Sequence, residues 1–279
     1  MTWNIVCDSS GDMTPAQLIP GKVSLKVAPL TLLVGDKEYV DDASLDVPAL
    51  LRHMAEEKGP SSTACPSPES FAQAFSSADC SLCFTISGNL SGTYNAACLG
   101  RDMVLEEHPE KKIFVLDTCS TSGSLYLLTQ KAVELIEAGV DFDQLCKALE
   151  KERNDQRTVF TLECFDNLVK NGRMKPLLGT LLHGLGIHVI ADATPEGTIR
   201  VVDKARGEKR TYRRMVSYME KEKDCTDAHV VIAHCQNPEG ASKLKEAILQ
   251  SLPVKKITTL ACRGLTSFYA MEKGLIVVY

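Results

Sequence analysis

The sequence contains no apolar run long enough to cross a membrane, because none of its hydrophobic stretches approaches the roughly 18 residues that a transmembrane helix needs. It also begins without the basic segment and long apolar stretch of a secretory signal, so we expect a cytoplasmic protein. Positive charge is not in excess either, since the net charge is −5 at pH 7. Such a chain has no general attraction for nucleic acids, so we expect no nucleic-acid partner, and transient membrane contact stays open.

The cysteines lack the pattern that disulfide or metal chemistry needs. The chain has 11 cysteines, an odd number, and most of them lie inside apolar runs, which is typical of buried reduced thiols. The one close pair, Cys80 and Cys83 in "CSLC", has no second C-x-x-C or H-x-x-H pair to complete a zinc site. We therefore expect no metal and no cofactor, and a redox role for this pair is the lowest-ranked hypothesis.

Short apolar runs alternate with amphipathic stretches along most of the chain. Runs such as "WNIVC" and "IFVL" are typical of buried strands, and stretches such as "GTYNAACLGRDMVLEE" are typical of helices. "TPAQL" adds a capping box that predicts a helix starting after Thr14. Strands that alternate with helices in this way predict an α/β fold with a mostly parallel sheet.

The alternation weakens after Leu162, where several glycines punctuate two predicted strands joined by "TPEGT". We therefore place a domain boundary near Asp155. The prediction is an N-terminal α/β domain of residues 1–155 packed on a C-terminal α/β domain of residues 156–279. The sequence has no flexible linker between the two, so they are expected to pack closely, with a ligand site in the space between them.

The segment "TISGNLSGTY" joins a predicted buried strand to a predicted helix and is rich in serine, threonine and glycine. Ligands of open α/β sheets bind at such loops, where the free amides of the first helical turn attract an anion. Ser87 and Ser91 would add hydroxyl donors, and Gly88 and Gly92 would let the anion approach the backbone. A plain helix N-cap at Ser91 is the alternative. Thr63, in the similar loop "SSTACPSPE", is expected to face the same edge of the sheet.

The segment "KARGEKRTYRR" is strongly basic. Its basic residues are Lys204, Arg206, Lys209, Arg210, Arg213 and Arg214. The simplest interpretation is a solvated helix face, and the main alternative is a surface that docks an acidic protein partner. Nucleic acid is a weaker alternative, because Tyr212 is the only aromatic residue in the run.

Taken together, these stretches resemble the DegV family of bacterial fatty-acid-binding proteins. The resemblance runs nearly from end to end, through "VCDSSGDMT", "VAPLTLLVGDKEYVDD", "TACPSPESF", "ISGNLSGTYNAA", "VLDTCSTSGSLYLL", "LVKNGRM" and "VDKARGEKR" in the family's order. Each motif is weak by itself, but seven motifs in order at similar spacing are specific.

The resemblance implies a two-domain α/β protein that holds one long-chain fatty acid in a buried tunnel between its domains. It implies that Thr63 and Ser91 hydrogen-bond the carboxylate, that Arg173 lies near it, and that "LLGTLLHGLGIHVIA" forms a wall of the tunnel. It also implies a carrier and not an enzyme, which presents the fatty acid to a separate fatty acid kinase for phosphorylation to an acyl phosphate. The surface implied to dock the kinase comprises Lys204, Arg206, Lys209 and Arg210.

The sequence departs from the family's pattern at three places near the expected head-group site, one of which is "ISGNLSGTY", where the family has "ISSxLSGTY". Ala64 and Cys65 stand where the family has serine and glutamine, and "TSFYAMEKG" replaces a pattern that carries a histidine. Counting back from Gly274 puts Ser267 at the position of that histidine, so Ser267 is expected to be a ligand-binding residue. The aromatic residues that follow Ser267 are expected to alter the length of the tunnel.

A second hypothesis, from another class, is an enzyme that acts on a small phosphorylated or carboxylated metabolite. It would use the loop around Ser91 as an anion cradle and Asp8 or Asp117 as the acid or base. Both aspartates directly follow predicted strands, where a turn-capping role is the simpler interpretation. The ligand that copurifies separates the hypotheses, because the carrier retains a long-chain fatty acid and the enzyme a phosphorylated polar molecule.

Overall fold

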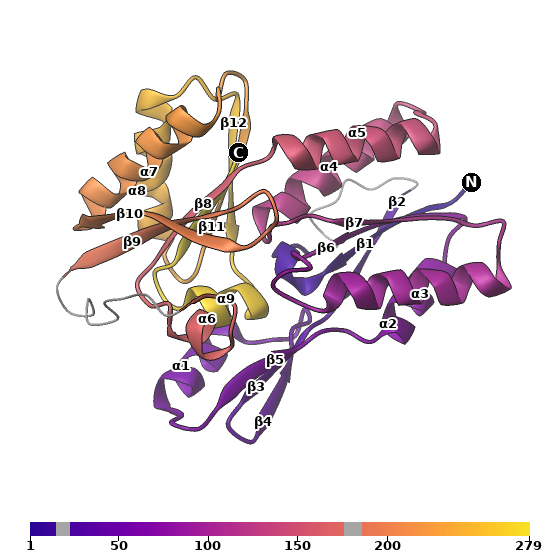
Figure 1. The fold of residues 1–279 in the computed structure, drawn as a ribbon, viewed down its shortest axis with the longest axis horizontal. Coiled ribbons are helices and arrows are strands. Elements are labelled where there is room, and N and C mark those ends of the chain that lie inside the picture. The colour runs from indigo at the N-terminus through magenta and orange to yellow at the C-terminus, as the bar shows by residue number, and fades with distance from the viewer. Residues whose placement is uncertain (15–22, 176–185) are drawn as a thin grey trace.

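The structure, a computed structural model, describes residues 1–14, 23–175 and 186–279. The helix predicted from "TPAQL" and the greater part of the predicted tunnel wall "LLGTLLHGLGIHVIA" lie outside these residues. Two large sheets and one small sheet form the fold, with helices packed on their faces (Figure 1). Within the described part of the chain, no helix is long and apolar enough to cross a membrane.

The N-terminal sheet has four parallel strands in the order β2-β1-β6-β7. Its strands are β1 (Trp3–Asp8), β2 (Val23–Ala28), β6 (Cys80–Thr85) and β7 (Lys112–Asp117). One face carries α2 (Pro68–Ser76) and α3 (Thr93–Glu107), and the other carries α4 (Gly123–Glu137) and α5 (Phe142–Asp155). β6 is buried at every position because helices cover both of its faces. The prediction of an α/β fold with a mostly parallel N-terminal sheet is confirmed.

The C-terminal sheet is mixed, with the strand order β10-β9-β8-β13-β11-β12. Its strands are β8 (Thr158–Leu162), β9 (Ile187–Ala193), β10 (Ile199–Arg206), β11 (His229–His234), β12 (Lys256–Ala261) and β13 (Leu275–Val278). β11 and β12 pair in parallel, and the other neighbours in this order pair antiparallel. The helices α7 (Glu208–Glu222) and α8 (Pro238–Ser251) pack on one face, and α4 contacts β11 and β13 on the other.

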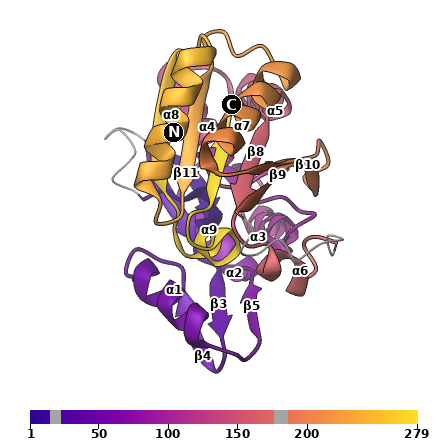
Figure 2. The ribbon, with the colours of Figure 1, turned by 90° about the vertical axis from the view of Figure 1, so that its left-hand side faces the viewer.

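A small antiparallel sheet, in the order β4-β3-β5, was absent from the prediction. It consists of β3 (Thr31–Val34), β4 (Lys37–Val40) and β5 (Ser61–Ala64), and it accompanies α1 (Val47–Glu56). Each strand has only four residues, and β4 and β5 are largely exposed, so they lack an apolar pattern. Thr63 lies on β5, opposite Leu32, and therefore belongs to a strand and not to the predicted loop. Figure 2 shows this sheet and α1 at the foot of the molecule, below α9 (Gly264–Ala270).

The helix α4 packs between the two large sheets. It contacts β6 of the first sheet and β11 and β13 of the second, and the buried apolar side chains of both halves form one continuous cluster with it. The approach is close, because a Cβ added to Gly123 would lie 2.8 Å from a methyl carbon of Val231. The predicted boundary between residues 1–155 and 156–279 falls between α5 and β8, and the division into two domains stays a prediction.

Three buried aspartates hold the loops that surround α9. Asp8 begins the 3-10 helix η1 (Ser9–Gly11) and accepts the amide of Ile86 at 2.6 Å. Asp12 accepts the amide of Arg263 at 2.6 Å and the hydroxyl of Ser122 at 2.5 Å. Asp41 accepts the first two amides of α9, those of Gly264 and Leu265, each at 2.8 Å. The two bonds of Asp41 satisfy amides that a helix leaves free at its N-terminus, and together with the bond from Arg263 to Asp12 they attach α9 to the N-terminal half.

We predict that Asp12→Asn makes the stability of the protein less dependent on pH between about pH 4 and pH 7. Burial raises the pKa of Asp12 to about 7, whereas an unfolded aspartate titrates near about 3.9. The folded protein therefore holds a proton that the unfolded chain releases, so this group's contribution to stability falls as pH rises through that window. One such group changes the free energy of unfolding by at most about 1.4 kcal/mol per pH unit. Urea unfolding at several pH values measures the slope.

Asp42→Asn is the matched control for this experiment. Asp42 follows Asp41 in the chain and is exposed, and hydrogen bonds from Ser44 lower its pKa. A carboxyl group with a lowered pKa adds stability as pH rises, which is opposite to the effect of Asp12. Asp42→Asn therefore cannot reduce a fall in stability above pH 4. An Asp12→Asn slope equal to that of the wild type would show that Asp12 is not the buried acid described here.

Candidate functional site

A cavity lies between the two halves of the chain and is lined by strands of the C-terminal sheet, by α9 and by the loops that follow β6 and β7. Its empty space is about 810 Å³ when the open solvent at its mouth is included. The apolar lining residues are Leu30, Ile86, Leu90, Phe160, Leu162, Leu168, Ala193, Ile199, Leu265, Ala270 and Ile276. The hydroxyl-bearing ones are Thr63, Ser91, Ser120, Thr121, Thr158, Thr198, Thr266 and Tyr269. The cavity can therefore hold an apolar molecule that carries a few polar groups.

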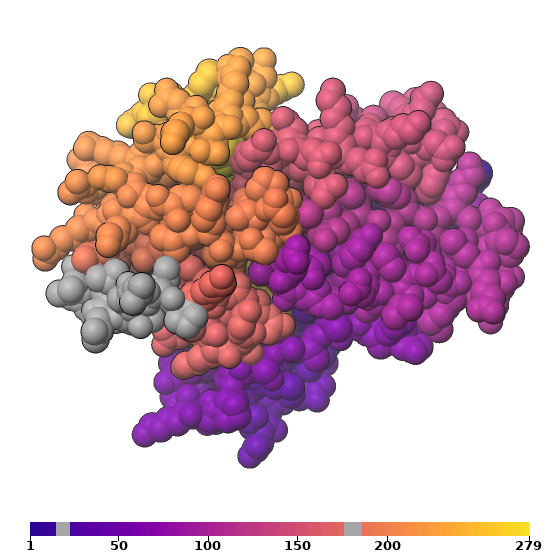
Figure 3. Space-filling view, in the orientation of Figure 1, coloured from indigo at the N-terminus to yellow at the C-terminus, as the bar shows by residue number. Residues whose placement is uncertain are grey.

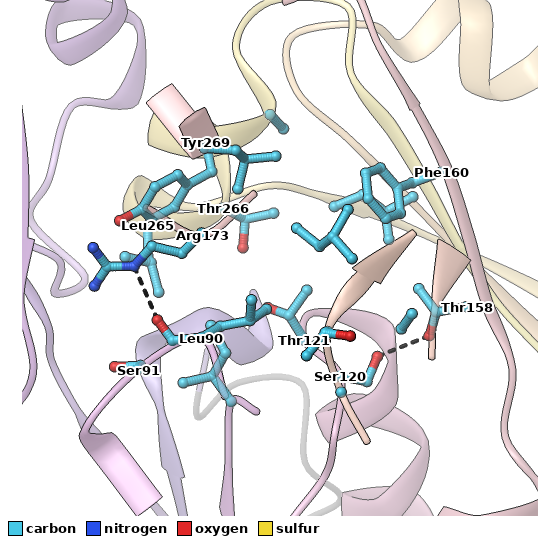
Figure 4. A pocket seen from close by; sticks show the side chains of 18 of the residues that line it. Leu90, Ser91, Ser120, Thr121, Thr158, Phe160, Arg173, Leu265, Thr266 and Tyr269 are labelled. Carbon is cyan, nitrogen blue, oxygen red and sulfur yellow. Dashed lines mark hydrogen bonds between the residues drawn. The ribbon is translucent and has the colours of Figure 1, made fainter. Parts of the chain in front are cut away.

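The structure brings Thr63, Ser91 and Arg173 to the lining of this one cavity. The side chain of Arg173 donates from Nε to the carbonyl of Leu90 at 3.0 Å, so the guanidinium is held beside the loop that carries Ser91 (Figure 4). The hydroxyl of Ser91 lies 2.8 Å from that of Thr93, the first residue of α3. A cation and hydroxyl groups at one end of an apolar cavity suit a carboxylate, which accepts short charge-assisted hydrogen bonds.

The sequence analysis did not include Tyr269 among the expected ligand-binding residues. Its hydroxyl lies 2.9 Å from Oγ1 of Thr63, and its ring lines the cavity near Arg173. Ser267, expected at this place, is fully buried, does not line the cavity, and donates to the carbonyl of Cys262 at 3.3 Å. Two residues along a helix turn the side chain by about 200°, so Ser267 and Tyr269 point to different faces. Leu265 and Tyr269 are four residues apart, so they share one face of the helix. This spacing could have indicated that Tyr269 faces the ligand.

Of the glycines and serines of "ISGNLSGTY", only Ser91 lines the cavity. Ser87 donates its hydroxyl to the carbonyl of Gly197 at 2.8 Å, and the amide of Gly88 donates to Asp117 at 3.0 Å. Neither group is free for an anion, so the prediction for Ser87 and Gly88 is wrong. Gly92 is the N-cap of α3 and does not line the cavity. The alternative of Ser91 as the N-cap is also wrong, because α3 begins at Thr93.

The aspartates considered as acid or base cap turns. Asp8 accepts the amides of Ser10 and Ile86, and Asp117 accepts those of Cys119 and Gly88. Each carboxylate therefore holds backbone amides on both oxygens. This confirms the turn-capping interpretation of both aspartates.

The hairpin between β9 and β10 closes the cavity from the C-terminal side. Besides the bond from Ser87 to Gly197, Asn89 donates from its amide nitrogen to the carbonyl of Glu196 at 2.6 Å. Figure 3 shows the atoms of this hairpin, in orange, packed against the magenta atoms of the N-terminal half. Gly197 has a φ of +79°, and a Cβ there would lie 2.2 Å from Oγ of Ser87. Only glycine therefore fits at this contact.

The cysteine pair and the basic run were the remaining candidates for a functional role. Cys80 and Cys83 are buried, and burial raises the pKa of both thiols, which opposes redox chemistry. Across residues 1–14, 23–175 and 186–279, no group of three metal-binding side chains is found. In the basic run, Lys204 and Arg206 lie on β10, Lys209 and Arg210 lie on α7, and all four are exposed.

The fold and the cavity define a class of protein: an α/β protein with a largely apolar ligand site between its two halves, and with a guanidinium and hydroxyl groups at one end of that site. The family model of the DegV proteins, described as "Uncharacterised protein, DegV family", matches residues 2–276. The chain belongs to the DegV family. A DegV domain-containing protein of Streptococcus pneumoniae is 36% identical over 279 residues, which cover 100% of this chain and 99% of that protein.

Solved structures of DegV proteins share this fold. The Fatty Acid Kinase (Fak) B3 protein of S. pneumoniae, loaded with linoleic acid, has a TM-score of 0.94 and 35% identity over 100% of this chain and 99% of that chain. A DegV family protein of Ruminococcus gnavus, refined with vaccenic acid, has a TM-score of 0.93 and 32% identity over 99% of each chain.

We predict that Gly197→Ala destabilises the protein by at least about 1 kcal/mol more than Gly139→Ala does. Both glycines have a positive φ, +79° at Gly197 and +72° at Gly139, so both variants carry backbone strain. A Cβ at Gly139 meets no atom within 4 Å, whereas one at Gly197 overlaps the Ser87 loop. Urea unfolding of the two variants measures the difference. Equal losses would mean that the hairpin contact is not tightly packed.

Proposed function

We propose that this protein binds one long-chain fatty acid in the cavity between its two halves. The carboxylate would lie at the end shared by Thr63, Ser91, Arg173 and Tyr269, and the acyl chain would run along the apolar walls. One observation carries the proposal: hydroxyl groups and a guanidinium gather at one end of a single, largely apolar cavity. The fatty acids in the structures of the S. pneumoniae and R. gnavus relatives support it.

The energetics of such a ligand are favourable. Each buried methylene contributes about 0.8 kcal/mol, so a chain of roughly 16 carbons contributes on the order of 10 kcal/mol before the costs of binding are subtracted. The carboxylate loses hydration when it enters the cavity, and its hydrogen bonds must replace that hydration. The Thr63–Tyr269 pair and the Ser91–Thr93 pair each leave one hydroxyl hydrogen free, and these hydrogens are available to donate such bonds.

We also propose that the protein is a carrier that presents its fatty acid to a separate fatty acid kinase, which phosphorylates the carboxylate. The relative named as a B3 protein of fatty acid kinase supports this partner. The exposed basic residues of β10 and α7 supply a surface for an acidic protein. We place this activity in the cytoplasm, and we propose that residues 1–155 and 156–279 act as two domains around the acyl chain.

We predict that Thr63→Val and Ser91→Ala each weaken the binding of palmitic acid by about 10- to 100-fold. Each variant removes a hydrogen bond to a charged group, worth about 1.5 to 3 kcal/mol, and about 1.4 kcal/mol corresponds to a factor of ten. Tyr269→Phe is expected to weaken binding through the same loss. Titration calorimetry on delipidated protein measures the dissociation constants.

Thr226→Val is the control, because Thr226 is exposed, bonds to Asp224 and does not line the cavity. Its affinity should equal that of the wild type. Mass spectrometry of organic extracts from gently purified wild-type protein tests the proposal independently, with one long-chain fatty acid per chain as the expected result. An empty extract from a protein that also fails to bind added fatty acid would refute fatty-acid binding.

We predict that the double variant Lys204→Glu and Arg206→Glu lowers the rate at which a fatty acid kinase from the same cell phosphorylates the bound fatty acid. The two side chains lie on one face of β10, so the charge reversal would repel an acidic partner surface. The affinity for fatty acid should not change. Kinase assays at low and high salt measure the effect, which salt should reduce.

The control for docking is the double variant Lys147→Glu and Lys151→Glu, which reverses two exposed charges on α5. It makes the same change in net charge at a different surface. If both double variants slow the kinase equally, net charge and not a local docking surface is responsible.

A further inference from the structure

A second set of hydroxyl groups lies in the cavity away from the proposed carboxylate site. Ser120 follows β7 in the N-terminal half, Thr158 begins β8 in the C-terminal half, and their side-chain oxygens lie 2.8 Å apart. Both line the cavity, and only 7% of Ser120 and 6% of Thr158 is exposed. Figure 4 shows this pair at the end of the pocket opposite Arg173 and Ser91.

The pair does not exhaust its own hydrogen-bonding capacity. Two hydroxyl groups have two hydrogens to donate, and the bond between Ser120 and Thr158 uses one of them. Among the described residues no other side-chain bond to either oxygen is found, so one hydrogen has no protein acceptor. The hydroxyl of Thr121, the next residue along the chain, also lines the cavity and has no partner in the described part of the structure.

An ordinary acyl tail leaves this capacity unused. A methylene chain offers no acceptor, so a bound saturated fatty acid would bury an unpaired hydroxyl hydrogen, which costs free energy. The carboxylate does not explain the pair, because the groups proposed to bind it lie at the other end of the pocket. A role in joining the two halves does not explain the pair either, because one hydrogen bond between Ser120 and Thr158 leaves the second hydroxyl hydrogen without an acceptor.

We propose that Ser120 and Thr158, with Thr121 beside them, form a second polar subsite that binds an oxygen substituent on the acyl chain. The preferred ligand is then an oxygenated long-chain fatty acid, such as a hydroxy acid, whose substituent lies far from the carboxylate. This inference rests on the proposed binding of a fatty acid. It deepens that proposal by naming the class of acyl chain.

The test compares stearic acid with its 2-, 10- and 12-hydroxy derivatives by titration calorimetry on delipidated protein. We expect the wild type to bind the 10- or 12-hydroxy acid about tenfold more tightly than stearic acid. The 2-hydroxy acid should show no such gain, because its hydroxyl lies beside the carboxylate. The double variant Ser120→Ala and Thr158→Val should bind stearic acid and lose the preference, since an apolar wall cannot pair with a hydroxyl group.

Thr161→Val is the matched control on the same strand. Thr161 is buried, donates its hydroxyl to the carbonyl of Val189 and does not line the cavity, so this variant should keep the preference. If the double variant fails to fold, the single variants Ser120→Ala and Thr158→Val take its place, and each should reduce the preference.

The outcomes separate this inference from the function on which it rests. If stearic acid binds but none of the hydroxy acids binds more tightly, the inference is overturned and the proposed function stands. A preference that survives the double variant also overturns it. If neither stearic acid nor any hydroxy acid binds the wild type, the proposed function itself fails.

Discussion

The cavity depends on a few buried carboxylates that hold backbone amides from distant parts of the chain. Asp41 accepts the first two amides of α9, Asp12 accepts the amide of Arg263 just before them, and Asp8 accepts the amide of Ile86 at the end of β6. A carboxylate buried this deeply is tolerated only where hydrogen bonds replace its hydration. The bonds of Asp41 and Asp12 hold α9, which lies near the end of the chain, against the N-terminal half, where it forms one wall of the cavity.

Once the start of α9 is fixed, the geometry of the helix decides which of its side chains can reach a ligand. Leu265 and Tyr269 lie on one face and line the cavity, whereas Ser267 faces the interior and bonds to Cys262. From the other side, Gly197 brings the β9–β10 hairpin onto the loop after β6. The cavity is thus closed by two contacts that each join the two halves of the chain.

Local patterns were sufficient for several strands that are buried on both faces. The strands Thr158–Leu162, His229–His234 and Leu275–Val278 have the predicted bounds, because such runs are rich in apolar residues. The strands of the small sheet were missed because short, half-exposed strands have no distinct period. The mixed order of the C-terminal sheet was missed too, since periodicity carries no information about strand direction. Thr63, Ser91 and Arg173 were identified through the order of family motifs, and all three line the cavity.

The sequence by itself determined the α/β class, most of the strands and helices, the family, and three residues that line the cavity. These properties follow from periodicity, turn chemistry and motif order, which are written in neighbouring residues. Only the tertiary structure decided which hydroxyl groups face the cavity and which serve the scaffold. The partner of Ser87 is 110 residues away at Gly197, and that of Thr63 is 206 residues away at Tyr269. A hydroxyl group takes its role from the atom it meets in space, and no local pattern specifies that atom.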